Sequence, residues 1–216
     1  MNFYVVVEGK GEKIIYRKWI KYINPTLRIV DSIDKVTNNN VYIISGNGYP
    51  SYFDIISNAI EDVSTLNCFD LLVVSVDSEK MTYMEKYHEI KTFIDQKNKN
   101  INYKIIIQHF CIETWALGNK IIIPRNPQSK IIRNYIQFYD VLLNDPENLP
   151  PYKNLNRAQF AYSYLHAILN DRYRNLTYHK TTPEVITNHK FFNRIKSRYL
   201  ESNHISSFKG LLDAFK

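Results

Sequence analysis

The N-terminal half of the chain alternates short apolar runs with segments in which apolar residues recur every three or four positions. A short β-branched run bounded by Gly, Asn or Asp is typical of a strand, whereas the longer spacing is typical of a helix that buries one face. We therefore expect strands over residues 2–7, 27–30, 41–44, 71–76 and 103–108. We expect helices over residues 13–23, 49–59, 81–97 and 110–117.

The order of these elements predicts the fold class. Strands that alternate with helices favour an α/β fold with a mostly parallel sheet flanked by helices. After Pro124 the β-like runs disappear and only helical spacing remains, with a proline-rich loop at residues 145–151. The helices expected there span residues 131–143, 157–169, 190–200 and 205–215. We therefore predict an α/β domain over residues 1–124, followed by an all-helical region over residues 125–216.

The charge of the chain is unevenly distributed. The 216 residues include 28 Lys and Arg against 21 Asp and Glu, a net charge of +7. Residues 1–150 hold equal numbers of acidic and basic side chains, so the whole excess lies in residues 151–216. A one-sided basic region of this kind predicts a nucleic-acid partner, and the alternative is a solvated helical face that binds nothing. The candidate contacts are Lys80 and, in the basic region, Lys180, Arg194, Lys196 and Arg198.

Other features of composition exclude several classes of protein. The two cysteines, Cys68 and Cys111, form no CxxC motif, which excludes a disulfide framework and a cysteine-based zinc cluster and fits a reducing compartment. No signal peptide precedes the first strand, and every apolar run is far shorter than the roughly 20 residues needed to cross a bilayer. We expect a soluble, cytoplasmic protein without a membrane partner. No GxxxxGK[ST] motif is present to bind ATP.

Acidic residues stand where the predicted strands end. Glu8 ends the first strand and is followed by Glu12, Asp77 ends the fourth and is followed by Glu79, and Glu113 comes after the last. Ligands of a parallel sheet bind outside the carboxyl ends of its strands, so we expect these carboxylates to converge. Divalent Mg²⁺ or Mn²⁺ would relieve their mutual repulsion. The alternatives are a first-turn position for Glu12 or Glu79 and an N-cap for Asp77.

Three short motifs in this order resemble one protein family. EGKGE (residues 8–12) resembles the Glu-Gly-x-x-Glu signature of the Toprim superfamily, and VDSEK (76–80) resembles its Asp-x-Asp signature, with Glu79 in place of the second aspartate. CIETWAL (111–117) is similar to a Cys-Phe-Glu-x-Trp-x-Leu segment of the small Toprim nucleases of bacterial defence, the OLD and RloB-like branch. The resemblance covers roughly residues 2–118. Glycines 46 and 48 resemble the small-residue loop of that family's metal crevice.

The resemblance implies a Toprim-like nuclease of anti-phage defence, which hydrolyses phosphodiester bonds of DNA or RNA with Mg²⁺ or Mn²⁺, as a pair of ions. Glu8, Asp77 and Glu113 would be catalytic, and Glu8, Glu12, Asp77 and Glu79 would contact metal. Because such nucleases often work with an ATPase, a separate ATPase subunit is one expected partner, and a homo-oligomer is a second expectation. His109, four residues before Glu113, is a candidate acid or phosphate donor.

Other functions remain as alternatives. The first is a non-catalytic α/β module with a vestigial acidic crevice, whose basic region binds nucleic acid or a protein partner. A phosphoacceptor receiver domain also gathers acids at strand ends, but it needs a lysine where this chain has Gln108 and His109. A primase would need a zinc-binding or helicase-binding appendage, and no such motif is present. Metal-dependent loss of a labelled nucleic acid distinguishes the nuclease from the binding module.

Overall fold

A computed structural model describes residues 1–98, 100–172 and 178–216, with the side chain of residue 172 left out. Contacts between residues group the chain into two compact units. Unit 1 comprises residues 1–76, 83–107 and 210–216, and unit 2 comprises residues 77–82 and 108–209. This grouping differs from the predicted division at residue 124, because the segments that follow the fourth and fifth strands pack with the helical region and the last seven residues pack with the sheet.

The sheet is five-stranded and parallel, with the order β2-β3-β1-β4-β5. Its strands are β1 (Phe3–Val7), β2 (Arg28–Val30), β3 (Asn40–Ser45), β4 (Leu71–Asp77) and β5 (Tyr103–Gln108). All residues of β1 and β4 are buried, as expected for central strands covered on both faces. Helices lie on both faces of the sheet and more helices follow it in the chain, so the predicted fold class is confirmed.

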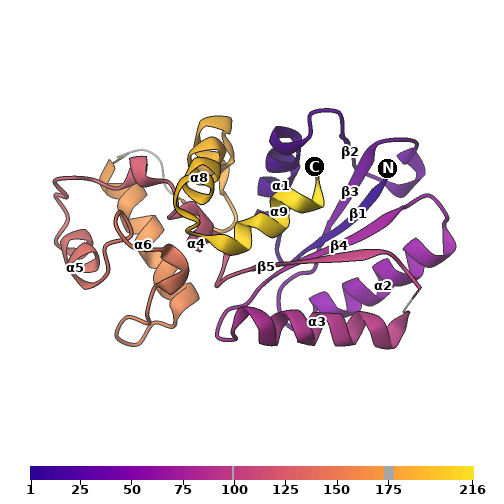
Figure 1. The fold of residues 1–216 in the computed structure, drawn as a ribbon, viewed down its shortest axis with the longest axis horizontal. Coiled ribbons are helices and arrows are strands. Elements are labelled where there is room, and N and C mark those ends of the chain that lie inside the picture. The colour runs from indigo at the N-terminus through magenta and orange to yellow at the C-terminus, as the bar shows by residue number, and fades with distance from the viewer. Residues whose placement is uncertain (99, 173–177) are drawn as a thin grey trace. The chain divides into compact units, whose positions relative to one another are not determined.

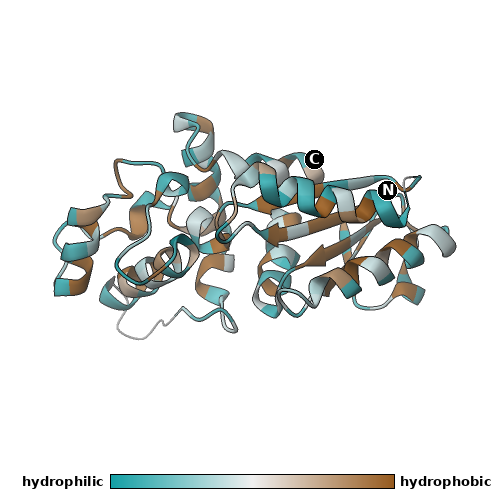
Figure 2. Ribbon diagram, turned by 90° about the horizontal axis from the view of Figure 1, so that it is seen from below, coloured by the Kyte–Doolittle hydropathy of each residue, from teal (hydrophilic) through white to brown (hydrophobic). Residues whose placement is uncertain are grey.

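Alternate residues of the central strands serve the two faces of the sheet. On one face, Tyr4, Val6 and Val74 belong to an apolar cluster with residues of α2 (Tyr52–Thr65) and α3 (Tyr83–Lys97). On the other face, the hydroxyl groups of Tyr16 and Ser75 lie 2.5 Å apart and tie α1 (Lys10–Ile23) to β4. Figure 1 shows α2 and α3 on one side of the sheet and α1 and α9 (Lys209–Ala214) on the other, and Figure 2 shows the strands as largely hydrophobic.

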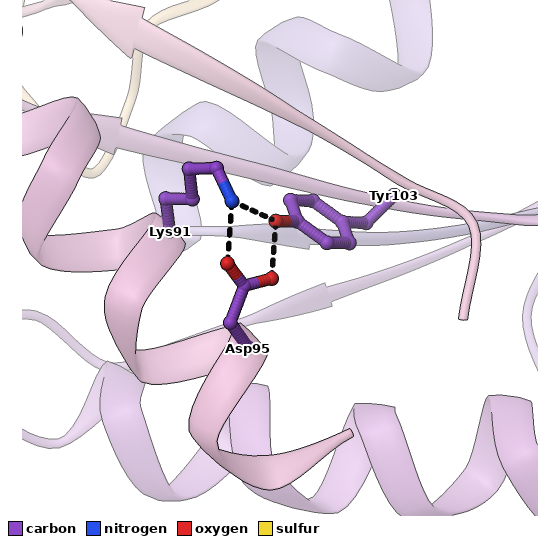
Figure 3. Close-up of polar contacts among 3 residues, drawn as sticks. All are labelled: Lys91, Asp95 and Tyr103. Carbon is purple, nitrogen blue, oxygen red and sulfur yellow. Dashed lines mark hydrogen bonds and ion pairs between the residues drawn. The ribbon is translucent and has the colours of Figure 1, made fainter. Parts of the chain in front are cut away.

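Polar contacts fasten the edge strand β5 to its helices. The Tyr103 hydroxyl donates to Asp95 at 2.7 Å and accepts from Lys91 at 3.3 Å, and Lys91 also forms an ion pair with Asp95 (Figure 3). The hydrogen bond to Asp95 raises the pKa of Lys91. On α9, the carbonyl oxygen of Asp213 accepts from Lys104 Nζ at 2.8 Å. These contacts explain why the C-terminal residues belong to the same unit as the sheet.

Unit 2 is built from helices, two of them long, α6 (Arg157–Arg172) and α8 (His189–Ser202), and the others short. The short helices are α4 (Ile112–Ala116), η2 (Lys120–Ile122), α5 (Lys130–Phe138), η3 (Pro146–Asn148), α7 (Glu184–Thr187) and η4 (Ser206–Phe208), where η denotes a 3-10 helix. Its core includes buried Trp115, Phe160 and Phe208. The buried carboxylate of Glu147 accepts hydrogen bonds from the Ser206 and Ser207 hydroxyls and from the Ser207 N–H. Burial raises the pKa of Glu147.

The helix expected over residues 49–59 spans Tyr52–Thr65 instead, and two other expected helices differ from the structure for local reasons. The helix expected over residues 131–143 ends at Phe138, since the backbone of Tyr139 is extended and its hydroxyl donates to the Asp145 carbonyl at 2.7 Å. The helix expected over residues 205–215 is divided into η4 and α9, and Ile205 before it has a left-handed φ of 52°. In the described parts of the chain, no helix is long and apolar enough to span a membrane.

Candidate functional site

The EGKGE segment of unit 1 forms the turn from β1 into α1. Glu8 follows β1 directly and is partly buried, and Gly9 is the N-cap of α1. A Cβ atom at Gly9 would lie 2.6 Å from the Glu12 carboxylate, so only glycine permits that carboxylate to lie against the turn. Glu12 is buried in the first turn of α1, where a negative charge interacts favourably with the helix dipole. The Glu-Gly-x-x-Glu spacing therefore has a steric basis in this chain.

The glycine loop after β3 is bonded to the end of β1, also within unit 1. The Gly46 N–H donates to the Val7 carbonyl at 2.7 Å, and the Gly48 N–H donates to the Glu8 carbonyl at 2.9 Å. A Cβ atom at Gly46 would lie 2.4 Å from Cβ of Tyr52, and Gly48 has a positive φ of 83°. Both positions require glycine, which fixes the backbone of Glu8 between two strand ends.

In the VDSEK segment, Val76 is the last apolar residue of β4 and belongs to unit 1, and residues 77–80 belong to unit 2. Asp77 is 4% exposed. The Ser78 N–H donates to the Gln108 carbonyl at 3.0 Å, and the Glu79 N–H donates to the Phe110 carbonyl at 2.9 Å. Because α3 begins only at Tyr83, Asp77 is not its N-cap and Glu79 is not in its first turn, so those two alternatives are wrong.

Glu113, on α4 in unit 2, is fully buried. Its Oε1 accepts a hydrogen bond from the Tyr178 hydroxyl at 2.8 Å, whereas its Oε2 has no hydrogen-bond partner among the residues that the structure describes. Burial raises the pKa of the Cys111 thiol well above its ordinary value, and the charges of Glu113 and Asp77 raise it further while Lys180 acts in the opposite direction. Both carboxylates therefore lie within electrostatic range of one buried thiol.

His109 does not have the protonation state that an acid requires. Burial, together with the charge of Arg157, lowers its pKa to about 4, so the imidazole is neutral near pH 7. The imidazole Nδ1 lies 2.8 Å from the Ser78 hydroxyl. The backbone N–H of His109 donates to the Ser207 hydroxyl at 3.3 Å. These contacts fix the segment after β5 against the segment after β4, which is a structural role.

A cavity of about 470 Å³ lies in unit 2 beside the VDSEK segment. Glu79, Lys80 and Lys180 line it, and α6 supplies Gln159, Tyr162 and Ser163. The structure therefore brings together three residues that the sequence analysis assigned to metal or nucleic-acid binding. The polar residues of α6 were missed, because nothing in the spacing of a helical segment shows which of its exposed positions border a cavity.

The basic residues of α8 do not share one surface. Arg198 is only 4% exposed, and its guanidinium donates to the carbonyl oxygens of Val141 and Asn144, each at 2.7 Å. The prediction that Arg198 contacts nucleic acid is therefore corrected, since the residue lies on the buried stripe of the helix with Phe191 and Ile195. Arg194 is exposed and Lys196 is partly exposed, so both stay candidate contacts.

The acidic residues can be tested for their fit to a metal ion. Among the described residues, no group of three or more His, Cys, Asp and Glu is placed to hold one. Asp77 and Glu113 nevertheless offer buried oxygen ligands, one without a hydrogen-bond partner, and Mg²⁺ is commonly held by one or two carboxylates with water and substrate phosphates. The residues of unit 2 fit that mode. The convergence of Glu8 and Glu12, in unit 1, with these residues stays a prediction.

Comparison with known proteins gives no match to any family model, curated protein or solved structure. The resemblance to Toprim nucleases therefore rests on the three motifs and their order along the chain. The sheet, the glycine-dependent turn at Glu8 and the two buried carboxylates of unit 2 are the structural observations on which a proposal of function depends.

Proposed function

We propose that the chain is a hydrolase of nucleic-acid phosphodiester bonds that depends on Mg²⁺ or Mn²⁺. The observation that carries the proposal is the pair of buried carboxylates, Asp77 and Glu113. The charges of both raise the pKa of the same buried thiol, Cys111. A buried carboxylate oxygen without a hydrogen-bond partner, as in Glu113, is costly unless a bound cation or a proton compensates it. A divalent cation is the compensation that also gives this pair a chemical use.

Asp77 and Glu113 would hold the metal, with Glu79 as a further ligand from the adjoining cavity. The metal would supply a water of lowered pKa and would stabilise negative charge on the phosphodiester oxygens. The Tyr178 hydroxyl orients the Glu113 carboxylate by its hydrogen bond to Oε1, so that Oε2 is the atom left for a ligand. Glu8 and Glu12 are the additional ligands that the resemblance implies.

The neighbouring cavity supports nucleic acid as the substrate class. Lys80 and Lys180 line it and can neutralise backbone phosphates, while Tyr162 presents an aromatic ring of the kind on which bases stack. Arg194 and Lys196 extend the positive charge along α8. The position of two lysines next to buried carboxylates is the arrangement needed to bring a polyanion to an acidic centre.

The alternative is a binding module without catalysis. It is favoured by one observation, the lack of a three-ligand metal group among the described residues. In that case Lys80 and Lys180 would bind nucleic acid, and Asp77 and Glu113 would have no catalytic part. The two functions differ in the consequence of removing a carboxylate, which affects cleavage in one and not in the other.

The test measures cleavage of end-labelled DNA and RNA oligonucleotides with Mg²⁺, with Mn²⁺ and with EDTA. We expect cleavage only with metal, and a loss of about a hundredfold or more in Asp77→Asn and Glu113→Gln, since a metal contributes several kcal/mol to such a reaction. Glu184→Gln, an exposed carboxylate of α7, is the matched control and should retain full activity. Cleavage by both site variants at the wild-type rate would rule out the catalytic assignment.

Binding of the same oligonucleotides, measured without metal, separates the two functions. Lys80→Ala with Lys180→Ala should weaken binding under either function. If that variant binds weakly and no condition gives cleavage, the chain is the binding module. If binding and cleavage are both absent in the wild type, neither function holds.

A further inference from the structure

Unit 2 contains a second and larger cavity, of about 640 Å³. Its walls come from η2, α6, α7 and α8, and it shares no lining residue with the cavity that contains Lys80 and Lys180. Its volume lies within the range of roughly 300 to 1,000 Å³ that is typical of sites for small molecules. The chemistry of its lining indicates what it would bind.

The interior of this cavity is apolar. Ile122, Leu169 and Phe191 line it and are buried side chains of three different helices. Ile121 also lines it and is 49% exposed, although it is a large apolar side chain. An occupant with an apolar body would cover Ile121 and remove apolar surface from water, which is favourable. The cavity therefore favours an apolar or aromatic group.

A buried amide gives the cavity one oriented hydrogen-bond donor. Asn119 lines it and is only 4% exposed. Its Oδ1 accepts from the Ile121 N–H at 3.1 Å and caps η2, which fixes the amide plane. Because Oδ1 is engaged in the cap, the amide can offer an occupant of the cavity its Nδ2 donor.

Two cations of α8 line the same cavity. Lys190 and Arg194 are four residues apart, so their side chains lie on one face of the helix. Both are exposed, and within the described ranges neither has an ion-pair partner. A carboxylate, sulfonate or phosphate held between them would form charge-assisted hydrogen bonds, and the arginine can bind such a group through two N–H donors.

We propose that this cavity is a binding site for a small amphipathic anion. Its apolar body lies against Ile122, Leu169 and Phe191, and its acidic group is bound by Lys190 and Arg194. Asn119 Nδ2 donates to an acceptor on the occupant, which selects a molecule with a polar atom next to the apolar body. The site is separate from the proposed nuclease centre, and its existence does not depend on that function.

The first test uses two dyes that differ by one acidic group. Anilinonaphthalene sulfonate carries the aromatic body and the anion, whereas N-phenylnaphthylamine has a closely similar body without the sulfonate. We expect fluorescence titration of the folded protein to give saturable binding of both, with the sulfonate bound about tenfold more tightly, equivalent to about 1.4 kcal/mol. Equal affinity for the two dyes, or no saturable binding of the sulfonate, would overturn the proposal.

Variants assign the binding to this cavity. Lys190→Ala with Arg194→Ala should remove the preference for the sulfonate and leave the neutral dye within about twofold. Asn119→Asp keeps the oxygen that caps η2 but replaces the donor with a negative charge, so it should weaken the sulfonate alone. The control, Lys130→Ala with Lys196→Ala, removes the same charge from positions that do not line the cavity and should bind both dyes as the wild type does.

Competition identifies the body of the natural occupant. Displacement of the sulfonate dye by dodecanoate indicates an aliphatic acid, and displacement by adenosine monophosphate indicates an aromatic phosphate. Either result supports the proposal, provided that the Lys190 and Arg194 variant loses the competition. Failure of both competitors, or competition that persists in that variant, contradicts it.

Discussion

The two units bury charge in different ways. Among the described residues, unit 1 buries Glu12 and Lys86, and the Lys86 ammonium has an acidic partner, Glu89, at 2.6 Å and the rings of Tyr49 and Tyr52 nearby. Unit 2 buries four charged side chains, Asp77, Glu113, Glu147 and Arg198.

The partners of these charges explain the difference. Glu147 accepts from hydroxyls and a backbone N–H, and Arg198 donates to backbone carbonyls, so both are stabilised by neutral dipoles from distant segments. Such charges position the irregular backbone that joins the helices of unit 2. The sheet of unit 1 has regular backbone hydrogen bonds and depends on apolar packing instead. The buried acids Asp77 and Glu113, by contrast, both raise the pKa of the Cys111 thiol, and Glu113 Oε2 has no hydrogen-bond partner among the described residues.

The largest expected effect comes from removing a buried charge in each unit. Arg198→Met should lower the free energy of unfolding by about 3 kcal/mol, because the buried Val141 carbonyl and the partly buried Asn144 carbonyl lose their donor. Lys86→Met should cost about 1 kcal/mol or less, because Glu89 is partly exposed and regains water. Denaturation followed by NMR of fluorine-labelled tryptophan separates the units, since Trp19 lies in unit 1 and Trp115 in unit 2.

This measurement can break the comparison. If Arg198→Met lowered the free energy of unfolding by less than Lys86→Met does, the neutral dipoles around Arg198 would not be a main source of the stability of unit 2. Lys196→Ala, a partly exposed neighbour on α8, is the control and should change stability by no more than about 0.5 kcal/mol.

A smaller effect concerns the exposed charges of unit 2. Arg194→Ala with Lys196→Ala should weaken nucleic-acid binding and lower the log-log salt slope by about 0.7 to 0.9 for each phosphate that the variant no longer neutralises. Lys18→Ala with Lys35→Ala removes the same charge from exposed positions of unit 1 and should leave the slope unchanged. Filter binding over a salt series measures both. An equal decrease of the salt slope in the two double variants would show that the net charge of the protein, and not the surface of unit 2, governs binding.

The last expected effect is a pH dependence confined to unit 2. The pKa of His109 is lowered to about 4 from 6.5, so between these values the unfolded chain binds a proton that the folded chain does not. The free energy of unfolding should therefore rise with pH through this window and gain nothing further from His109 above it. His109→Gln should reduce the rise at the Trp115 resonance. A rise of unchanged size in that variant would assign it to other groups.

Much of unit 1 is determined by local sequence. The expected strand at residues 103–108 matches β5, β1, β2 and β4 each differ from expectation by one residue at one end, and β3 is longer than expected by one residue at each end. Apolar runs bounded by polar turns suffice to place these strands, because each strand is a short run whose own residues carry the pattern. Gly9 of EGKGE could also be foreseen as a turn residue. That the Glu12 carboxylate lies against this turn could not be foreseen.

The tertiary structure alone decided the rest, because it depends on partners far apart in the chain. The sequence predicts Arg198 to be a surface cation, because charged residues are usually exposed. In the structure it is buried, and it donates to carbonyl groups 54 and 57 residues away. Lys80 and Lys180 are brought to one cavity, and Tyr178 to Glu113, by the packing of α6 and its neighbours. Periodicity shows that a helix has a buried face. Only packing determines which distant atoms contact that face and form hydrogen bonds with its polar groups.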